Sequence, residues 1–291
     1  MRLGIMTGTF QKVQQTGLGQ KGVYHWRQRT FENAALDALA MNLNDLAVMR
    51  REAKKLHNHI IIQEEDEEAI LEVIGTLGAE CKKRGIIMDS GETSIQDNII
   101  GFDVSVTITG EMTRKSDNKF ASGDYLIGIQ SSGLHSNGFT RVRKVFGEEL
   151  RKEFVEPTQI YYDTLISLIK DGARINGMAH ITGGAYAKNL KNPLGKNLDV
   201  FIERNPDLKP QSIFYEIKER GEFTDEEMYK TFNCGVGFVL SVPKTSNGDL
   251  REIIERLTFE NGTHAYIFGE VTNGNGNVRI QSSFSDGEIV L

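Results

Sequence analysis

The sequence predicts a mixed α/β fold, because three of its segments have clear and different periodicities. Residues 31–49 are rich in Ala, Leu and Met and contain no Gly or Pro, which is typical of a helix. Apolar side chains recur at helical spacing from Ile70 to Cys81, and Gly85 supplies a helix stop. Apolar and polar residues alternate over 102–109, as in a half-buried strand. Helices and strands in one chain predict an α/β or α+β protein.

The remaining elements are less regular. The first 30 residues are rich in Gly, Gln and Thr and show little periodicity, so we expect a loop with at most one short strand. A short buried strand is expected at 59–62. In the second half we expect a strand at 125–129, a helix from about residue 139, a helix over about 158–170, and strands at 236–242 and 265–271.

The chain is long enough for two domains. It has 291 residues, of which 39% are hydrophobic and 25% charged, as in an ordinary globular protein. Residues 113–123 are polar and rich in turn formers, so we place the boundary there and expect domains at 1–114 and 115–291. Each is large enough to bury its own core.

Composition and charge argue against several classes of protein. The formal net charge of −6 favours neither nucleic acid nor an anionic membrane as a partner. Cys81 and Cys234 lie far apart without CxxC spacing, which argues against a zinc site or a disulfide framework. No apolar stretch approaches the roughly 20 residues of a membrane span, and the N-terminus does not resemble a signal peptide. We expect a cytoplasmic protein.

Two short segments place glycine beside charged residues. In residues 16–21 (TGLGQK) the glycines let the backbone approach a phosphate and Lys21 can neutralise it, although a flexible surface turn has the same composition. Residues 89–93 (DSGET) follow the apolar residues 86–88, and a carboxylate at the end of a strand is a common metal ligand. A plain turn explains this second segment equally well.

The predicted helix at 31–49 carries Asp37, Asn44 and Asp45. At about 100° per residue, Asn44 returns almost to the face of Asp37, and Asp45 lies about 80° away. Carboxylates on an otherwise apolar helix can bind one Mg²⁺ together with the phosphates of ATP. The alternative is that both acids face solvent on an amphipathic helix, and the spacing leaves the two interpretations open.

Residues 131–138 (SSGLHSNG) lie between a predicted strand and a predicted helix. Successive backbone N–H groups at a helix N-terminus, together with serine hydroxyls, form a good anion site. His135 can donate to a phosphate or move a proton near neutral pH. Capping of the helix by Ser or Asn explains one or two of these residues but not the whole string, so we favour phosphate binding.

Two further strings combine glycines with polar side chains. In residues 180–185 (HITGGA) a His and a Thr precede a Gly pair, although a lone His is more often structural. In residues 231–237 (TFNCGVG) the glycines stand at the start of a predicted strand. The simplest interpretation there is close backbone packing with a small buried cysteine.

Four strings in the second half resemble, in the same order, the AIR synthase (phosphoribosylformylglycinamidine cyclo-ligase) family: SSGLHSNGFTRVRKV, EPTQIYYDTLISLI, AHITGGAYAKNL and EEMYKTFNCGVGFVLSVP. In the first half, TGLGQK is similar to the family's DGVGTK, ALDALAMNLND to its GIDLVAMCVND, and SGETS to its GGETA. No gap is needed between Lys21 and Glu92 to align these motifs.

The resemblance implies two α/β domains, a homodimer formed through the N-terminal domain, and ATP with Mg²⁺ bound near the acidic residues. It also implies a ring closure, in which ATP activates the formyl oxygen of formylglycinamidine ribonucleotide and a substrate nitrogen expels phosphate. The products are aminoimidazole ribonucleotide, ADP and phosphate. Phosphorylation is needed because an amide-type oxygen is a poor leaving group, and the protein must screen the repulsion between two anionic ligands.

The motifs and the resemblance together give a set of expected site residues. The expected metal ligands are Asp37, Asp45 and Glu92, and the expected nucleotide contacts are Gly17, Gly19 and Asn44. The expected catalytic residues are His135, Lys21 and His180. The expected contacts to substrate or phosphate are Ser131, Ser132, Gly133, Ser136, Asn137, Thr182, Gly183, Gly184 and Asn233.

The chain departs from the family pattern in three places. Thr16 replaces the Asp of DGVGTK, fifteen residues precede that motif where the family has some tens, and the family's Pro-Gly-Met-Tyr loop after Glu92 is missing. Two alternatives therefore stay open. One is another ATP-dependent member of the superfamily, of the thiamine-monophosphate kinase, selenophosphate synthetase or hydrogenase-maturation type. The other is a catalytically weak nucleotide-binding regulator. The HSNG and TFNCGVG strings favour the cyclo-ligase.

Overall fold

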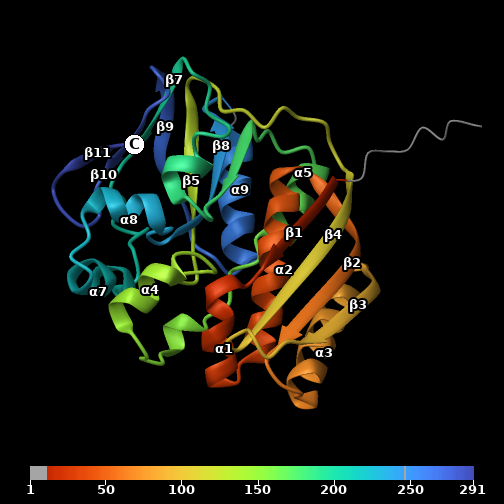
Figure 1. The fold of residues 1–291 in the computed structure, drawn as a ribbon. Helices are drawn as coiled ribbons and strands as arrows, with labels where there is room; N and C mark the ends of the chain where they lie inside the picture. Colours follow the sequence, from red (N-terminus) through yellow and green to blue (C-terminus); the bar gives the residue numbers. More distant parts are fainter. Residues whose placement is uncertain (1–11, 246) are drawn as a thin grey trace, which may run out of the picture.

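The computed structural model describes residues 12–245 and 247–291 and shows a mixed α/β chain, as expected (Figure 1). Its first half contains, in order, β1 (Lys12–Gly17), η1 (Gly19–Lys21), α1 (Gly22–Gln28), α2 (Phe31–Val48), β2 (Arg51–Ile62), α3 (Glu67–Arg84), β3 (Ile87–Ile95) and β4 (Phe102–Met112). These strands form a four-stranded sheet in the order β1-β4-β2-β3. In that sheet β4 is antiparallel to both neighbours, and β2 is parallel to β3.

The second half is built on a larger sheet. It contains β5 (Asp124–Gln130), α4 (Phe139–Phe146), η2 (Lys152–Phe154), α5 (Tyr162–Lys170), β6 (Gly177–His180), α6 (Ala185–Asn189), β7 (Leu198–Ile202), α7 (Ser212–Arg220), α8 (Asp225–Thr231), β8 (Val236–Pro243), α9 (Asn247–Phe259), β9 (Ala265–Asn273), β10 (Val278–Gln281) and β11 (Glu288–Val290). Its seven strands have the order β11-β10-β7-β9-β5-β8-β6.

The elements with the strongest periodicity are confirmed. The helix expected at 31–49 is α2, and α3 ends at Gly85, whose φ of 67° is the left-handed conformation typical of a helix C-terminus. The strand expected from Phe102 is β4, which alternates between buried and half-buried side chains as far as Gly110. Side-chain spacing was sufficient for α3 and β4 because each buries one face, whereas α2 is buried on nearly every side and was recognised from its Ala- and Leu-rich composition.

Four local expectations are wrong. The first 30 residues include helix α1. Strand β2 spans twelve residues rather than four. It pairs with β3 on one side and with β4 on the other, and this pairing includes its polar residues in the strand. Residues 89–93 lie within β3 rather than in a turn. Helix α5 begins at Tyr162 rather than near residue 158, because the preceding residues are held by hydrogen bonds to α2.

The two halves share one hydrophobic core. A single cluster of buried side chains includes Leu39 and Val104 from the first half and Leu165 and Phe238 from the second. A second cluster lies mainly in the C-terminal half. The segment between the end of β4 and the start of β5 joins the two sheets, and the division at 114/115 stays a prediction. Figure 1 shows α2 between the two sheets, where it supports the candidate site.

Candidate functional site

Helix α2 brings the polar residues of the first half against the second half. Asp37 and Asn44 point to the same side, as their helical spacing predicts, and both bind the backbone of segment 156–161. Asp45 lies on a neighbouring side and contacts His180 at the end of β6. Asp37 and Asp45 therefore both contact the other half of the protein.

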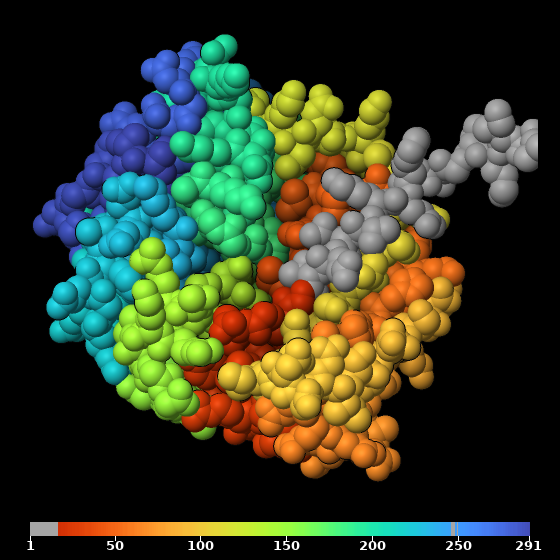
Figure 2. All heavy atoms as spheres, viewed as in Figure 1, coloured from red at the N-terminus to blue at the C-terminus, as the bar shows by residue number. Residues whose placement is uncertain are grey.

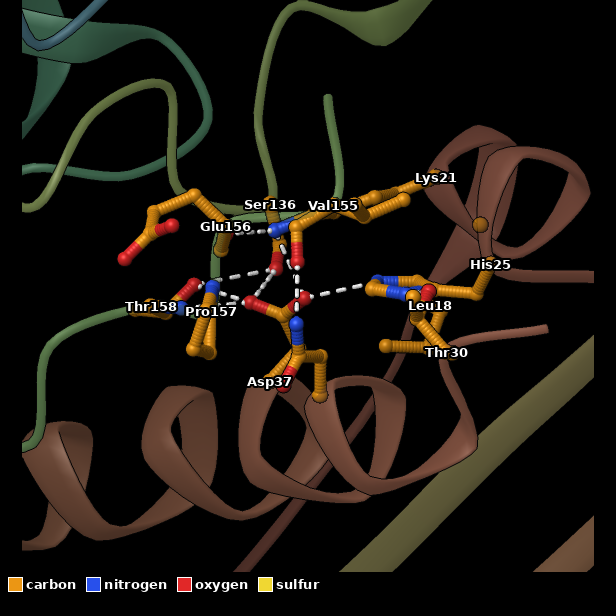
Figure 3. Close-up of polar contacts among 12 residues, drawn as sticks. Leu18, Lys21, His25, Thr30, Asp37, Ser136, Val155, Glu156, Pro157 and Thr158 are labelled. Atoms are coloured by element: carbon orange, nitrogen blue, oxygen red, sulfur yellow. Dashed lines mark hydrogen bonds and ion pairs between the residues drawn. The ribbon is translucent and has the colours of Figure 1, made fainter. Parts of the chain in front are cut away.

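The carboxylate of Asp37 is the centre of a buried network (Figure 3). Lys21 Nζ lies 2.6 Å and His25 Nε2 2.9 Å from Oδ2. Oδ1 accepts hydrogen bonds from Ser136 Oγ at 2.9 Å, Thr158 N at 2.7 Å and Thr158 Oγ1 at 2.6 Å. These donors come from three separate segments, so the carboxylate ties α2 to η1, α1 and two loops of the second half.

The network contains an ion pair and a neutral imidazole. Burial alone would raise the pKa of Asp37, but the charge of Lys21 and the hydrogen bond from His25 hold it well below its usual range. Burial lowers the pKa of His25, against the opposing effect of Asp37. His25 Nδ1 lies 2.8 Å from Thr30 Oγ1, so the neutral ring donates from Nε2 to Asp37 and accepts the Thr30 hydroxyl.

The buried network bears on the roles expected for Lys21, as a catalytic residue, and for Asp37, as a metal ligand. Lys21 is fully buried and donates from Nζ to the Glu156 carbonyl at 2.6 Å as well as pairing with Asp37. A carboxylate surrounded by five donor groups suits an ion-pair acceptor better than a metal ligand, because its oxygens already have partners. The side chains of Lys21 and Asp37 are both fully buried.

His135 lies in the loop 131–138 and is buried, with a left-handed φ of 58°. Its Nε2 accepts from the Ser132 backbone N–H at 3.3 Å. Burial, followed by the nearby His180 and Lys21, lowers the pKa of His135 to about 3. The imidazole is therefore neutral at physiological pH, which does not fit the expected movement of a proton near neutrality.

Asn233 organises the same loop. Its Oδ1 accepts from Ser131 Oγ at 3.0 Å and from Gly235 N at 2.9 Å, while its Nδ2 donates to the Gly133 carbonyl at 2.8 Å. These bonds join the start of β8 to the loop after β5. With its amide oxygen and nitrogen both paired inside the protein, Asn233 is placed to hold the loop.

His180 and Asp45 form the polar pair that borders an open cavity. His180 Nδ1 lies 2.9 Å from Asp45 Oδ1, and the imidazole stacks on Phe238 with ring centroids 5.8 Å apart. Both residues line a cavity of about 200 Å³, together with Thr182 and Gly183. The side chain of Asp45 is 29% exposed, in contrast to that of Asp37. This cavity is the candidate site.

The loop 131–138 lies beside the candidate site. A Cβ on Gly183 would meet the amide oxygen of Asn137 at 3.6 Å, so the two loops are neighbours. Gly184 has a φ of 86° and is the residue from which α6 begins. Ser132 donates from Oγ to the Pro157 carbonyl at 2.6 Å. The structure thus brings the expected phosphate-binding residues of the second half into one region.

The expected residues of the first half are more scattered. Glu92 is exposed on β3, and Gly17 and Gly19 flank Leu18 at the end of β1. The Leu18 and Gly19 N–H groups donate to Asp103 Oδ1, at 2.8 and 3.2 Å, so a carboxylate occupies the expected phosphate cradle. The side chain of Thr16 lies outside the described residues.

The expected metal ligands do not meet in one chain. No group of three or more His, Cys, Asp or Glu residues within 12–245 and 247–291 is arranged to hold a metal ion. Asp37, Asp45 and Glu92 lie respectively in the buried network, at the cavity and on the exposed strand β3. Their assignment as metal ligands stays a prediction.

Sequence reasoning missed some residues of the site. Thr158 makes two hydrogen bonds to Asp37, and its only signal was its place in the string EPTQIYYDTLISLI. His25 lies in a segment without periodicity, which gave no signal at all. Asn118 and Lys188 also line the cavity with His180 and Asp45, and only the packing of distant segments reveals this.

Comparison with known proteins gives matches across most of the chain. The family models for the AIR synthase related protein match at residues 12–112 (N-terminal domain) and 121–281 (C-terminal domain). The phosphoribosylformylglycinamidine cyclo-ligase of Methanococcus vannielii is 33% identical over 294 residues, which cover 94% of this chain and 80% of that protein. The enzyme of the same name from Saccharolobus solfataricus is 33% identical over 268 residues, covering 89% and 78%.

Solved structures show the same fold. The hydrogenase maturation protein HypE in complex with ATP superposes with a TM-score of 0.69, over 100% of this chain and 86% of that one. The sequence identity is 15%, so this likeness establishes the fold alone.

Proposed function

This chain belongs to the AIR synthase related family, and we propose that it is a phosphoribosylformylglycinamidine cyclo-ligase of purine biosynthesis. Curated relatives that cover about nine-tenths of the chain bear that name, and a ligase of this kind joins carbon to nitrogen in closing a ring. The structural observation that supports the proposal is the His180–Asp45 pair at a cavity that both halves of the chain line.

In the proposed reaction, the γ-phosphoryl group of ATP moves to the formyl oxygen of formylglycinamidine ribonucleotide. A substrate nitrogen then attacks the activated carbon, the carbon–oxygen bond breaks and phosphate leaves. The ring closes to aminoimidazole ribonucleotide, with ADP as the second product. Because the substrates are both anionic, the site must hold them together against their repulsion. ATP binding is in keeping with the nucleotide-bound neighbour of the same fold.

The residues around His180 suit proton handling. Asp45 accepts from the Nδ1 side of the ring, and Asn44 Nδ2 lies 3.4 Å from Nε2, so the imidazole is held from both edges. A histidine oriented by a carboxylate is a common general base, because the carboxylate stabilises the protonated ring. We assign the removal of the proton from the attacking nitrogen to Nε2 of His180, which exchanges its contact with Asn44 Nδ2 for the substrate nitrogen.

The residues at the cavity suit a Mg²⁺ ion that arrives bound to ATP. They do not suit an ion whose ligands all come from the protein. Mg²⁺ bound to ATP keeps several waters and takes only one or two protein carboxylates. Asp45 is the partly exposed carboxylate at this cavity, and we propose it as a ligand. The ion would neutralise charge on the phosphates.

The Asp37 network has a positioning role in this proposal. It anchors segment 156–158 and Ser136 to α2, and the loop containing Ser136 borders the cavity through Asn137. Lys21, which we expected to be catalytic, supplies the counter-charge that lets this carboxylate stay ionised while buried. The network thus fixes the phosphate-binding loop relative to α2.

We also propose a cytoplasmic homodimer, the state that the family resemblance implies. No helix in the described part of the chain is long and apolar enough to cross a membrane. We expect the two copies to meet at the outer face of the four-stranded sheet.

The function is tested by measuring ADP release in a coupled assay with and without formylglycinamidine ribonucleotide. We expect release only when both that substrate and Mg²⁺ are present. Asp45→Asn should lower kcat/KM about 100-fold, since it removes the charge that orients and supports His180. Asp97→Asn, which changes an exposed carboxylate on the loop after β3, is the matched control and should retain full activity.

Three results would count against this function. ADP release without the ribonucleotide would indicate a simple ATPase, and phosphorylation of thiamine monophosphate would indicate a kinase of the same superfamily. Nucleotide binding without any turnover would indicate a regulator.

A further inference from the structure

A second polar cavity lies where the connection from β4 to β5 passes the end of α5. Its volume is about 410 Å³, and its walls come from residues 114–121, residues 173–176 and Arg50. Figure 1 shows this connection running from the end of β4, across the edge of the molecule, to the larger sheet. A cavity of several hundred Å³ is large enough for a small metabolite.

The cavity is lined by an excess of positive charge. Its charged residues are one acid, Asp117, and five basic residues, Arg50, Arg114, Lys115, Lys119 and Arg174. The chain as a whole has a net charge of −6, so the positive charge of this cavity is opposite in sign to that of the whole protein. No carboxylate in the described residues forms an ion pair with Arg50, Arg114, Lys115 or Lys119. Among residues 12–245 and 247–291 these four cations therefore have no ion-pair partner, and Asp117 is the one acid on the cavity wall.

Arg50 is the most informative of these residues. It is 3% exposed, donates from Nη2 to the Ile175 carbonyl at 2.5 Å, and leaves its buried Nε without a partner in the described part of the chain. Burial, and then the charge of Arg114, lowers the pKa of Arg50. Its φ of 53° is a conformation that arginine rarely adopts. A buried guanidinium whose Nε has no partner is costly unless an anion pairs with it.

We propose that this cavity binds a small phosphate-bearing anion, at a site separate from the His180–Asp45 cavity. Guanidinium groups match the geometry of phosphate oxygens, and two arginines in one cavity can hold two sides of the group. Nucleic acid is a poor fit, because the positive charge lines a bounded cavity on an acidic protein instead of an extended surface.

Asn118 separates the two cavities and lines both. Its Nδ2 donates to the Met178 carbonyl at 3.0 Å, and its Oδ1 accepts from Met178 N at 2.8 Å. Met178 lies two residues before His180 in β6. The anion site is therefore next to the candidate active site, and an experiment must distinguish the two.

Calorimetric titration of pyrophosphate into the full chain, without Mg²⁺ or ATP, tests the proposal. Arg114→Gln/Lys115→Gln removes two exposed cations from the cavity and should weaken pyrophosphate binding about tenfold. Lys82→Gln/Lys144→Gln removes two exposed cations elsewhere and should change it less than about twofold. In the parent protein, the amide NMR signals of 114–121 and 173–176 should shift most on titration.

Measuring Mg-ATP affinity in the same variants distinguishes this site from the proposed nucleotide site. We expect Arg114→Gln/Lys115→Gln to leave that affinity unchanged. Equal pyrophosphate affinity in all the proteins would overturn the proposal. So would equal weakening in both double variants, which would indicate general charge screening. A parallel loss of Mg-ATP affinity would overturn it too, because the anion would then be bound in the nucleotide site. Turnover of formylglycinamidine ribonucleotide is not measured in this test, so the result does not depend on whether the proposed function is correct.

Discussion

At the scale of single residues, three histidines show how the neighbouring groups decide what a side chain does. His25, His135 and His180 are all buried, with exposures of 0, 1 and 4%. His25 and His180 each contact a carboxylate, whereas Nδ1 of His135 has no partner among the described residues. The histidine without a carboxylate partner is the one whose pKa falls to about 3.

This difference predicts a pH dependence of stability. The pKa of His135 is about 3 in the folded protein and about 6.5 in the unfolded chain, so the unfolded state takes up the proton first as the pH falls. The contribution of His135 to stability is therefore complete above pH 6.5 and is lost progressively below it. When the pH is lowered from 7 to 5, the unfolding free energy of His135→Asn should fall by about 2 kcal/mol less than that of the parent.

Urea unfolding at several pH values measures this effect. Asparagine is chosen because it tolerates the left-handed backbone at this position. His264→Asn, at an exposed position, is the control and should keep the pH dependence of the parent. Parallel stability curves for His135→Asn and the parent would mean that His135 takes up its proton at the same pH in the folded and unfolded states.

At the scale of elements, the contact between α1 and β4 depends on the first residue of the helix. A Cβ on Gly22 would lie 2.0 Å from the Phe102 carbonyl oxygen, which is far inside any allowed contact. Gly75 lies in the middle of α3, where a Cβ would meet nothing within 4 Å. Gly22 therefore allows α1 to touch β4, whereas Gly75 only lowers the stability of α3.

The two alanine substitutions should therefore have opposite effects. Gly22→Ala should destabilise the protein by about 2 kcal/mol, because α1 must move away from β4. Gly75→Ala should stabilise it by about 0.5–1 kcal/mol, through the higher helix propensity of alanine. Urea midpoints measure both, and a Gly22→Ala protein as stable as the parent would show that the approach of α1 to β4 is not tight.

At the scale of the whole molecule, no helix or strand among residues 12–245 and 247–291 covers the outer face of the four-stranded sheet. The side chains of His57, His59 and Thr107 on this face of β2 and β4 are half-buried, while the alternate residues are buried against the helices. In Figure 1, α2 and α3 lie on the inner side of this sheet. The space-filling view in Figure 2 shows strands of the first half at the molecular surface.

We therefore predict a homodimer in which this face meets that of a second copy. Sedimentation should give the mass of a dimer at micromolar protein. Thr107→Glu places a charge in the middle of the face and should shift the protein towards monomer, because a buried unpaired carboxylate is costly. Gln281→Glu, which changes an exposed side chain at the end of β10, should leave the mass unchanged. A monomeric parent protein would contradict the prediction.

The fold was predictable where one residue pattern decides one element. Helix α2 follows from an Ala- and Leu-rich run, and β4 follows from strict alternation. The same reasoning failed for α1, because a helix of seven residues is too short to show a helical period. It also failed for residues 158–161, which would continue α5 but bind instead to Asp37 and Asn44 on α2.

By itself, the sequence determined the mixed fold class, the family, and the segments from which the site is built, because these depend on local spacing and on short motifs. Only the tertiary structure decided what each site residue does. Asp37 and Asp45 are two turns apart on one helix, yet the first is sealed in an ion pair with Lys21 and the second borders a cavity with His180. Their partners are far away in the chain, and burial, which sets charge state and access, exists only once those distant segments have packed together.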